Sequence, residues 1–223
     1  MFKPDELEAM LARVGEALPT ELRLYLIGGC AMSFRGLKDK TKDVDAVLLD
    51  RSGLKLLGSV LKRLNFTQDT DLDDFYLSAV MVFKHGDSRI DLFVRDVCKQ
   101  LVFTDRMVKR AKLYKNFGKL FVYLASNEDI FLFKAITDRE KDIDDCLSLL
   151  TIGVDSRIIV DEMEKQTRTH WCFFVYEKLC LIADHTGLIP SFKEEVKQIC
   201  LKKMKDVPGD FLREVKNQKK HWP

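Results

Sequence analysis

Residues 22–45 read LRLYLIGGCAMSFRGLKDKTKDVD, and this stretch decides the fold. It begins with an apolar run over residues 22–27, which has the length and composition of a short buried strand. The pair Gly28-Gly29 ends that run, and the apolar residues that follow over 30–35 predict a short helix. A second strand is expected over residues 43–49. The stretch therefore predicts a strand, a glycine turn, a helix and a strand in close succession.

Two aspartates, Asp43 and Asp45, stand two positions apart at the start of the second predicted strand. Alternate residues of a strand point to the same face, so their carboxylates are expected to project together. Two such carboxylates can share one Mg²⁺ ion, which prefers oxygen ligands and keeps water or substrate phosphates in its other positions. The backbone at Gly28 and Gly29 can approach a ligand closely, and the start of the following helix offers N–H groups to phosphate oxygens. The pattern indicates a site for a metal ion and a phosphate.

A third carboxylate comes from Asp91, which interrupts an otherwise apolar strand expected over residues 88–94. A charge flanked by Ile90 and Leu92 is costly to bury unless a cation or another partner compensates it. Three carboxylates on neighbouring strands, together with a glycine turn, strengthen the prediction of a metal–phosphate site.

The rest of the chain separates into a region that mixes helical and strand patterns and a region that is helical. Helices are expected over residues 4–18 and 52–64, and strands over residues 75–83, 113–117 and 120–124, with a hairpin turn at 84–87. From residue 127 to residue 222 the pattern is helical throughout. We therefore predict an α/β (α+β) fold, in which residues 1–125 form a catalytic domain with a mixed sheet and flanking helices and residues 126–223 form an α-helical domain.

Composition excludes several classes of protein. The 223 residues are 46% apolar and 32% charged, which is typical of a globular domain, and the net charge of +2 gives no global preference for nucleic acid. The apolar runs are too short to span a bilayer and no leader segment is recognisable, so no membrane association is expected. The six cysteines form no CxxC pair, which argues against zinc and favours reduced thiols in the cytoplasm.

The deciding stretch resembles the nucleotidyltransferase superfamily, which has the DNA polymerase β-like fold, and looks most like the AbiEii-type toxin and related uncharacterised prokaryotic nucleotidyltransferases. That pattern has a Gly-Gly start, a small helix, a glycine and a T-x-D-x-D strand, and it is matched here by Gly28, Gly29, Ala31, Gly36, Thr41, Asp43 and Asp45. The third carboxylate of the family corresponds to Asp91. This chain has Cys30 where many relatives have a serine, although Ser33 follows Cys30 one helical turn later. It also lacks the arginine that many relatives have shortly before the threonine. The resemblance covers residues 20–150.

A later family motif, a lysine followed by R-x-K-D-x-x-D, has a loosely spaced counterpart at residues 129–145. By resemblance, Lys134 is expected to reach the triphosphate, and Asp142 to place the acceptor or to orient Lys134. The same residues also fit an ordinary helix whose acids and bases pair at three- and four-residue spacing.

The resemblance implies transfer of a nucleoside monophosphate from a nucleoside triphosphate (NTP) to an acceptor hydroxyl. It implies that Asp43, Asp45 and Asp91 are catalytic and bind Mg²⁺ or Mn²⁺. The nucleotide-binding residues that it implies are Gly28, Gly29, Ser33, Thr41, Lys134 and Asp142.

The acceptor stays open between RNA (including a tRNA end), a protein side chain and a small molecule. Six basic residues against one acid over 105–119 could follow an RNA backbone or could simply be a solvated surface. The resemblance also suggests the toxin of a toxin–antitoxin pair, which would have a cognate antitoxin as partner. The alternative is a non-catalytic nucleotide-binding or partner-binding protein that retains the fold.

Overall fold

The computed structural model describes residues 2–70, 80–86, 88–137, 139, 141–168, 171–203, 205 and 209. The chain divides into two compact units, Met1–Ser126 and Asn127–Pro223.

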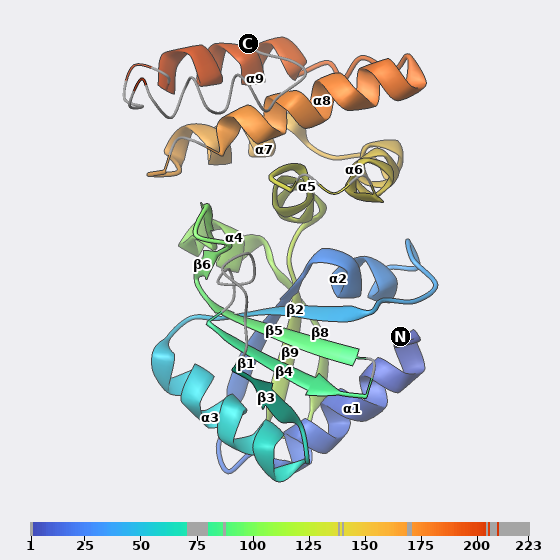
Figure 1. Cartoon of the computed structure of the whole chain (residues 1–223), viewed down its shortest axis with the longest axis vertical. Helices are drawn as coiled ribbons and strands as arrows, with labels where there is room; N and C mark the ends of the chain where they lie inside the picture. Colours follow the sequence, from blue (N-terminus) through green and yellow to red (C-terminus); the bar gives the residue numbers. More distant parts are fainter. Residues whose placement is uncertain are drawn as a thin grey trace. The chain divides into compact units, whose positions relative to one another are not determined.

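A mixed sheet forms the centre of the first unit (Figure 1). Its seven main strands lie in the order β3 (Thr67–Asp69), β4 (Met81–His85), β5 (Ser88–Val94), β2 (Asp43–Leu48), β1 (Leu22–Ile27), β9 (Leu120–Leu124) and β8 (Lys112–Phe117). The pairs β2–β5 and β1–β9 are parallel, and the other neighbours in this order are antiparallel. Two short strands, β6 (Asp96–Val97) and β7 (Leu101–Val102), extend the sheet beyond the end of β5. The mixed sheet expected from the sequence is confirmed.

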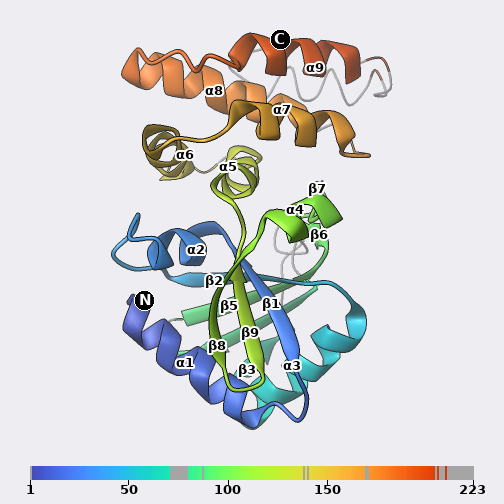
Figure 2. The same ribbon diagram turned by 180° about the vertical axis from the view of Figure 1, so that it is seen from behind.

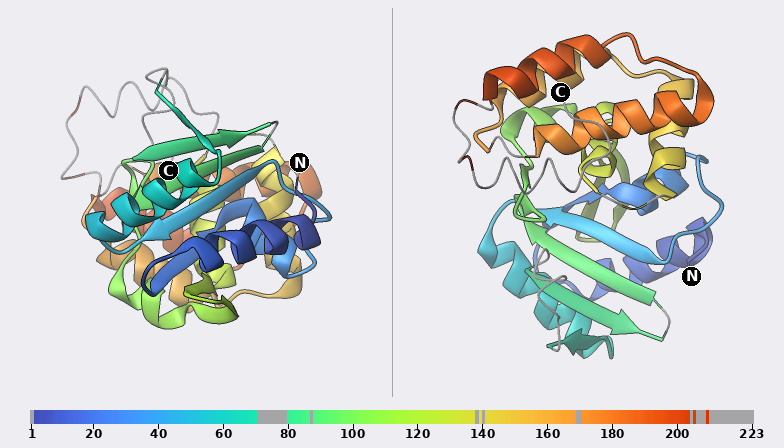
Figure 3. Two further views of the ribbon diagram at one scale, coloured as in Figure 1. Left: turned by 90° about the horizontal axis from the view of Figure 1, so that it is seen from below. Right: turned by 45° about the horizontal axis from the view of Figure 1, so that its top comes forward.

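Two helices, α1 (Pro4–Ala17) and α3 (Arg51–Arg63), contact each other and pack against the sheet (Figure 3). Local sequence explains where each begins. Pro4 stands at the start of α1, where a missing N–H costs nothing, and the Asp50 carboxylate caps α3 by accepting the backbone N–H of Gly53 at 2.8 Å. Apolar residues such as Leu7, Leu26 and Val60 are fully buried in this unit.

Strands β3, β6 and β7 were not predicted, and three other elements differ from the prediction. Helix α2 (Gly28–Phe34) includes the two glycines as its first residues. Strand β4 lies over residues 81–85, because His85 pairs with Ser88 across a tight loop; residues 75–79 of the predicted strand, and Asp87 of the predicted turn, lie outside the described residues. Helix α4 (Asp105–Arg110) was missed, because its basic residues were interpreted as a charged run although Thr104 accepts the Met107 N–H as a helix cap.

All the secondary-structure elements that the structure describes in the second unit are helices, as expected (Figure 2). Its helices are α5 (Asn127–Ala135), α6 (Lys141–Ile152), α7 (Ser156–Lys165), α8 (Cys172–Thr186) and α9 (Lys193–Lys203). Gly187 ends α8 in the left-handed conformation, at φ 73°, which glycine adopts without strain. Among the helices of the described residues, none has the length and apolar character needed to cross a lipid bilayer.

Candidate active site

The strand pair β2–β5 brings the predicted carboxylates together. Asp45 lies directly beside Asp91, and Asp43 lies directly beside Arg89. Residues paired in this way share a face of the sheet, so three carboxylates and one guanidinium form a two-by-two array on one face. On its other side Asp45 pairs with Ile27, the last residue of β1 before the glycine turn.

Gly28 fits against the carboxylate of Asp45. Its φ of +63° is a conformation that side chains with a Cβ rarely adopt. A Cβ at this position would stand 2.5 Å from Asp45 Oδ2, which is closer than two such atoms can approach. The turn therefore requires glycine both for its backbone conformation and for its contact with a predicted metal ligand.

Thr41 braces the same turn. Its hydroxyl donates to the backbone carbonyl of Asp43 at 2.8 Å, and its Oγ1 would lie 3.1 Å from a Cβ on Gly29. Two backbone hydrogen bonds, of 2.7 and 2.9 Å, also join Thr41 to Phe2. The structure thus places Thr41 beside Gly29 and beside the start of β2, where the sequence predicted a nucleotide contact.

Two side chains of α2 point into the interior instead. Ser33 is 3% exposed, and its Oγ has no hydrogen-bond partner among the described residues. The Cys30 thiol is fully buried and donates to the Ile27 carbonyl at 3.0 Å, with the Asp45 carbonyl at 3.6 Å. Cys30 therefore links the turn to β1 and β2.

Arg89 is the residue of this array that the sequence reasoning missed. Its Nε donates to Asp91 Oδ1 at 2.5 Å, and its Nη2 donates to Asp91 Oδ2. Asp91 is only 5% exposed, so the cation that its burial demanded is supplied by the same strand. The spacing of two residues on one strand was the signal that could have identified it.

The fit of a divalent cation can be judged from these contacts. Carboxylate oxygens are ligands that Mg²⁺ prefers, and both Asp43 and Asp45 are partly exposed beside a turn that a Cβ would fill. Both oxygens of Asp91 are occupied by Arg89, and within the described residues no three His, Cys, Asp or Glu side chains converge as a ready-made metal cluster. Asp43 and Asp45 fit a metal ion as they stand, whereas Asp91 would share its oxygens between a metal ion and Arg89.

In the second unit, Lys134 and Asp142 also meet. Lys134 Nζ lies 2.7 Å from Asp142 Oδ1 and 2.8 Å from Asp145 Oδ2, and the Thr137 hydroxyl donates to Asp142 Oδ2. Burial lowers the pKa of Lys134, but the two carboxylates outweigh burial and leave that pKa above its ordinary value. Burial raises the pKa of Asp142, and Lys134 more than reverses this, so the pKa of Asp142 lies below its ordinary value. Asp145 was not predicted as a partner, although its three-residue spacing from Asp142 places it on the same face of α6.

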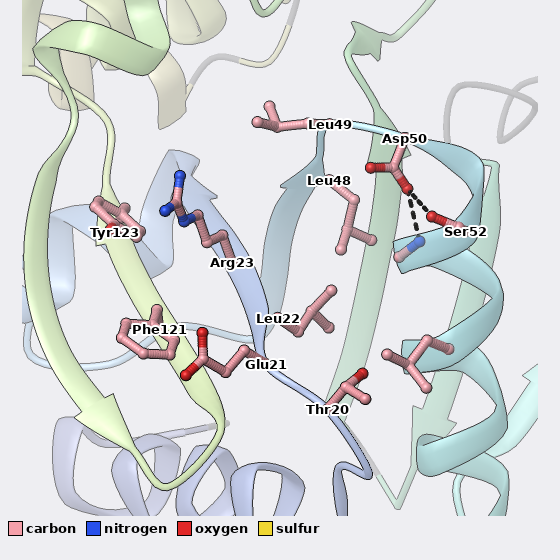
Figure 4. Close-up of a pocket in the computed structure, with 12 residues that line it drawn as sticks. Thr20, Glu21, Leu22, Arg23, Leu48, Leu49, Asp50, Ser52, Phe121 and Tyr123 are labelled. Carbon is pink, nitrogen blue, oxygen red and sulfur yellow. Dashed lines mark hydrogen bonds between the residues drawn. The ribbon is translucent and has the colours of Figure 1, made fainter.

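A hollow of about 660 Å³ lies at the other end of β1, where β1 and β2 are no longer paired (Figure 4). It is bordered by the first residues of β1 and α3, by the end of β2 and by Phe121 and Tyr123 of β9. None of the predicted site residues lines it.

Comparisons with known proteins agree with this geometry. Residues 6–173 match the family described as "Nucleotidyltransferase of unknown function (DUF6036)". A search of curated proteins finds no significant match.

Several solved structures are similar to this chain. The crystal structure of ANT(2″)-Ia in complex with adenylyl-2″-tobramycin has a TM-score of 0.47 and 14% identity, covering 69% of this chain and 90% of that one. The solution structure of the antibiotic-resistance factor ANT(2″)-Ia has a TM-score of 0.42 and 13% identity, covering 90% of each chain. JHP933 from Helicobacter pylori has a TM-score of 0.39 and 13% identity, covering 96% of this chain and 93% of that one. The family match spans most of the chain and includes the glycine turn and all three aspartates, and the chain therefore belongs to this nucleotidyltransferase family.

Proposed function

We propose that this nucleotidyltransferase moves a nucleoside monophosphate from an NTP to an acceptor hydroxyl in a reaction that depends on Mg²⁺ or Mn²⁺. The observation that carries the proposal is the array on β2 and β5, in which Asp45 lies beside Asp91 and against the Gly28 turn. A sheet face that gathers three carboxylates beside a glycine turn suits a metal–triphosphate substrate better than it suits an apolar ligand.

Asp43 and Asp45 would hold the metal ion, and Asp91 would join them in competition with Arg89. When bound, a divalent cation would neutralise phosphate charge and favour the developing charge of the transition state. Oxygen donors alone make this site, which agrees with Mg²⁺ or Mn²⁺ rather than with a softer metal.

The chain's own groups supply the rest of the proposed reaction. The acceptor oxygen forms a bond to the α-phosphorus, the bond from that phosphorus to the β-phosphate oxygen breaks, and pyrophosphate leaves. The Asp91 carboxylate would accept the proton of the attacking hydroxyl. The backbone at Gly28 and Gly29 would border the phosphates, with Thr41 holding the turn in place. Lys134 is assigned by resemblance to the charge of the leaving pyrophosphate, and Asp142 orients its ammonium at 2.7 Å.

By resemblance, we also propose an RNA acceptor, a cytoplasmic setting and the role of toxin in a toxin–antitoxin pair. Transfer assays with protein and small-molecule acceptors test the other two classes of acceptor. Nucleotide binding without turnover would support the non-catalytic alternative.

Thermal denaturation in the presence of an NTP tests the binding half of the proposal. Mg²⁺ or Mn²⁺ together with an NTP should raise the melting temperature, because a ligand that binds only the native state stabilises it. The double variant Asp43→Ala, Asp45→Ala should lose this shift. Asp39→Ala, which removes an exposed acid of the neighbouring loop, should keep it. An unchanged shift in the double variant would place the nucleotide elsewhere.

Turnover tests the catalytic half. Asp91→Asn should lower the transfer rate by at least about 10²-fold, the lower end of what a positioned acid–base group contributes, while NTP binding survives. If activity per folded molecule stays level and only stability falls, Asp91 is a structural acid and not the base of the reaction.

A further inference from the structure

Arg89 lies within the carboxylate array rather than at its rim. It is the register partner of Asp43, and its guanidinium forms two bonds to Asp91. The side chain of Asp91 is 7% exposed and that of Arg89 is 20% exposed, so the pair is largely shielded from water. The array thus contains one cation among three carboxylates.

The guanidinium of Arg89 offsets the repulsion among the three carboxylates. Carboxylates gathered on one face repel each other, and the repulsion is strongest where water is excluded. A guanidinium matches a carboxylate with two parallel N–H···O bonds, which are stronger than neutral hydrogen bonds. Arg89 therefore stabilises Asp91 in its buried position without a metal ion.

The same two bonds compete with metal binding. Both Oδ atoms of Asp91 accept from Arg89, so the guanidinium and a metal ion compete for the electron density of the same two oxygens. A positive guanidinium beside Asp43 and Asp91 also opposes the approach of a second positive charge.

We propose that Arg89 is a built-in counterion of the active site, which holds Asp91 in the nucleotide-free protein and competes with a divalent cation for the Asp91 carboxylate. The inference rests on the proposed function, because it takes the aspartate array to be the metal site. Arg89 is then a positioning residue, which acts on the reaction through Asp91. It keeps the array stable when empty and weakens metal binding until the substrate arrives.

Lys84 provides a matched control. It is the register partner of Arg89 on β4, so its side chain emerges on the same face one strand further out. Its ammonium lies 2.5 Å from Asp69 on β3, and its side chain is 55% exposed. Removing Lys84 takes the same charge from the same face without freeing Asp91.

The test is Mn²⁺ binding to the nucleotide-free full chain, followed by electron paramagnetic resonance or calorimetry, together with the melting temperature in chelator. Arg89→Ala should bind Mn²⁺ about tenfold more tightly than the native chain, the scale of one charge-assisted hydrogen-bond pair, while melting at a lower temperature in chelator. Arg89→Lys keeps the charge but loses the paired geometry and should lie between the two. Lys84→Ala should bind Mn²⁺ like the native chain.

The outcomes separate two failures. If the double variant Asp43→Ala, Asp45→Ala binds Mn²⁺ as well as the native chain, the proposed metal site is wrong. If that variant loses Mn²⁺ but Arg89→Ala binds it equally or more weakly, the metal site stands and Arg89 is not a competing counterion. Should Arg89→Ala not fold, Arg89→Lys decides: affinity at or below that of the native chain overturns the inference.

Discussion

At the residue scale, Gly28 combines a left-handed backbone conformation with close contact to Asp45, a proposed metal ligand. Gly28→Ala adds a methyl group 2.5 Å from Asp45 Oδ2 on a backbone with φ +63°. We expect a loss of about 2 kcal/mol or more in the free energy of unfolding, because a strained backbone and a collision add. The shift of melting temperature by metal and NTP should disappear, since Asp45 has to move. Denaturant unfolding and the thermal assay measure the two effects.

Gly36→Ala is the matched control for this change. Gly36 has a similar φ of +72°, but a Cβ there would meet no atom within 4 Å. Gly36→Ala should lower the free energy of unfolding by only about 1 kcal/mol, which is the cost of the backbone conformation. The shift of melting temperature by metal and NTP should remain. Equal losses in both variants would show that contact with Asp45 adds nothing.

Lys134 forms the other charged contact at this scale. Lys134→Met should lower the free energy of unfolding by about 3–5 kcal/mol, because the buried carboxylates of Asp142 and Asp145 lose the ammonium that both contact. Lys141→Met, on the exposed start of α6, should change it by less than about 0.5 kcal/mol. Similar small losses in both variants would contradict a buried ion triad. A parallel loss of NTP affinity in Lys134→Met would support the role assigned by resemblance.

The same contact predicts a dependence on pH. The pKa of Asp142 is lowered in the fold, so its contribution is present above the ordinary pKa of 3.8 and is lost as pH falls through the lower folded value. In Lys134→Met the remaining burial should raise that pKa instead. The variant should therefore gain stability as pH falls from about 6 to 4, where the native protein gains none from this group. Unfolding curves across this range would show the variant gaining stability relative to the native protein as pH falls, and parallel slopes would refute the pairing.

At the element scale, helix α1 packs backbone to backbone against the β8–β9 turn. A Cβ on Gly15 would stand 1.7 Å from the Phe117 carbonyl oxygen, and the Gly15 carbonyl accepts the Lys119 N–H at 3.4 Å. Gly→Ala within a helix normally adds about 1 kcal/mol of stability. Here Gly15→Ala should instead cost about 2 kcal/mol or more, because α1 must move away from the sheet.

Gly58→Ala in α3 serves as the comparison for α1. A Cβ there would meet the Met81 Sδ at 3.2 Å, the flexible end of a side chain that can move aside. Gly58→Ala should therefore be less destabilising than Gly15→Ala in the same denaturant assay. The reverse order would mean that α1 tolerates displacement.

At the scale of the whole molecule, the basic run divides between two elements. Its first three basic residues lie on α4 and the next two on β8, where Lys115 pairs with a carboxylate of α1 at 2.6 Å; Lys119 follows and binds a backbone carbonyl at 2.7 Å. Lys109 and Lys112 are exposed at the junction of α4 and β8. If the acceptor is RNA, this junction is where its backbone would be followed.

Replacing Lys109, Arg110 and Lys112 with Ser tests the RNA acceptor. RNA affinity should depend steeply on salt, and the triple variant should flatten the log–log slope by about two to three units, because each neutralised phosphate contributes roughly −0.7 to −0.9. NTP binding should not change. Replacing Arg51, Lys55 and Lys62 of α3 with Ser removes the same charge elsewhere and should leave the slope unaltered. No RNA binding at about 50 mM salt, or an unaltered slope in the first variant, would point to a protein or small-molecule acceptor.

Much of the fold could be predicted because its signals are local. Strands β1, β5 and β9 were predicted with their observed bounds. Each is an apolar run next to a glycine turn, at Gly28, Gly86 or Gly118, and both signals depend only on neighbouring residues. Helix α4 was missed because a short helix with one buried side chain has almost no periodicity. The displaced β4 reflects a turn whose length depends on the pairing of two strands.

For the site, the sequence by itself determined which residues carry charge and which turn requires glycine: Asp43 and Asp45 two apart, and Asp91 in an apolar strand. Only the tertiary structure decided that Asp45 lies beside Asp91, that Arg89 binds Asp91, and that Asp145 joins Lys134. The physical reason is the distance along the chain over which each interaction acts. Backbone preference and alternation act over a few residues, whereas the partner of a buried charge depends on strand order, register and helix packing, which bring distant residues within reach.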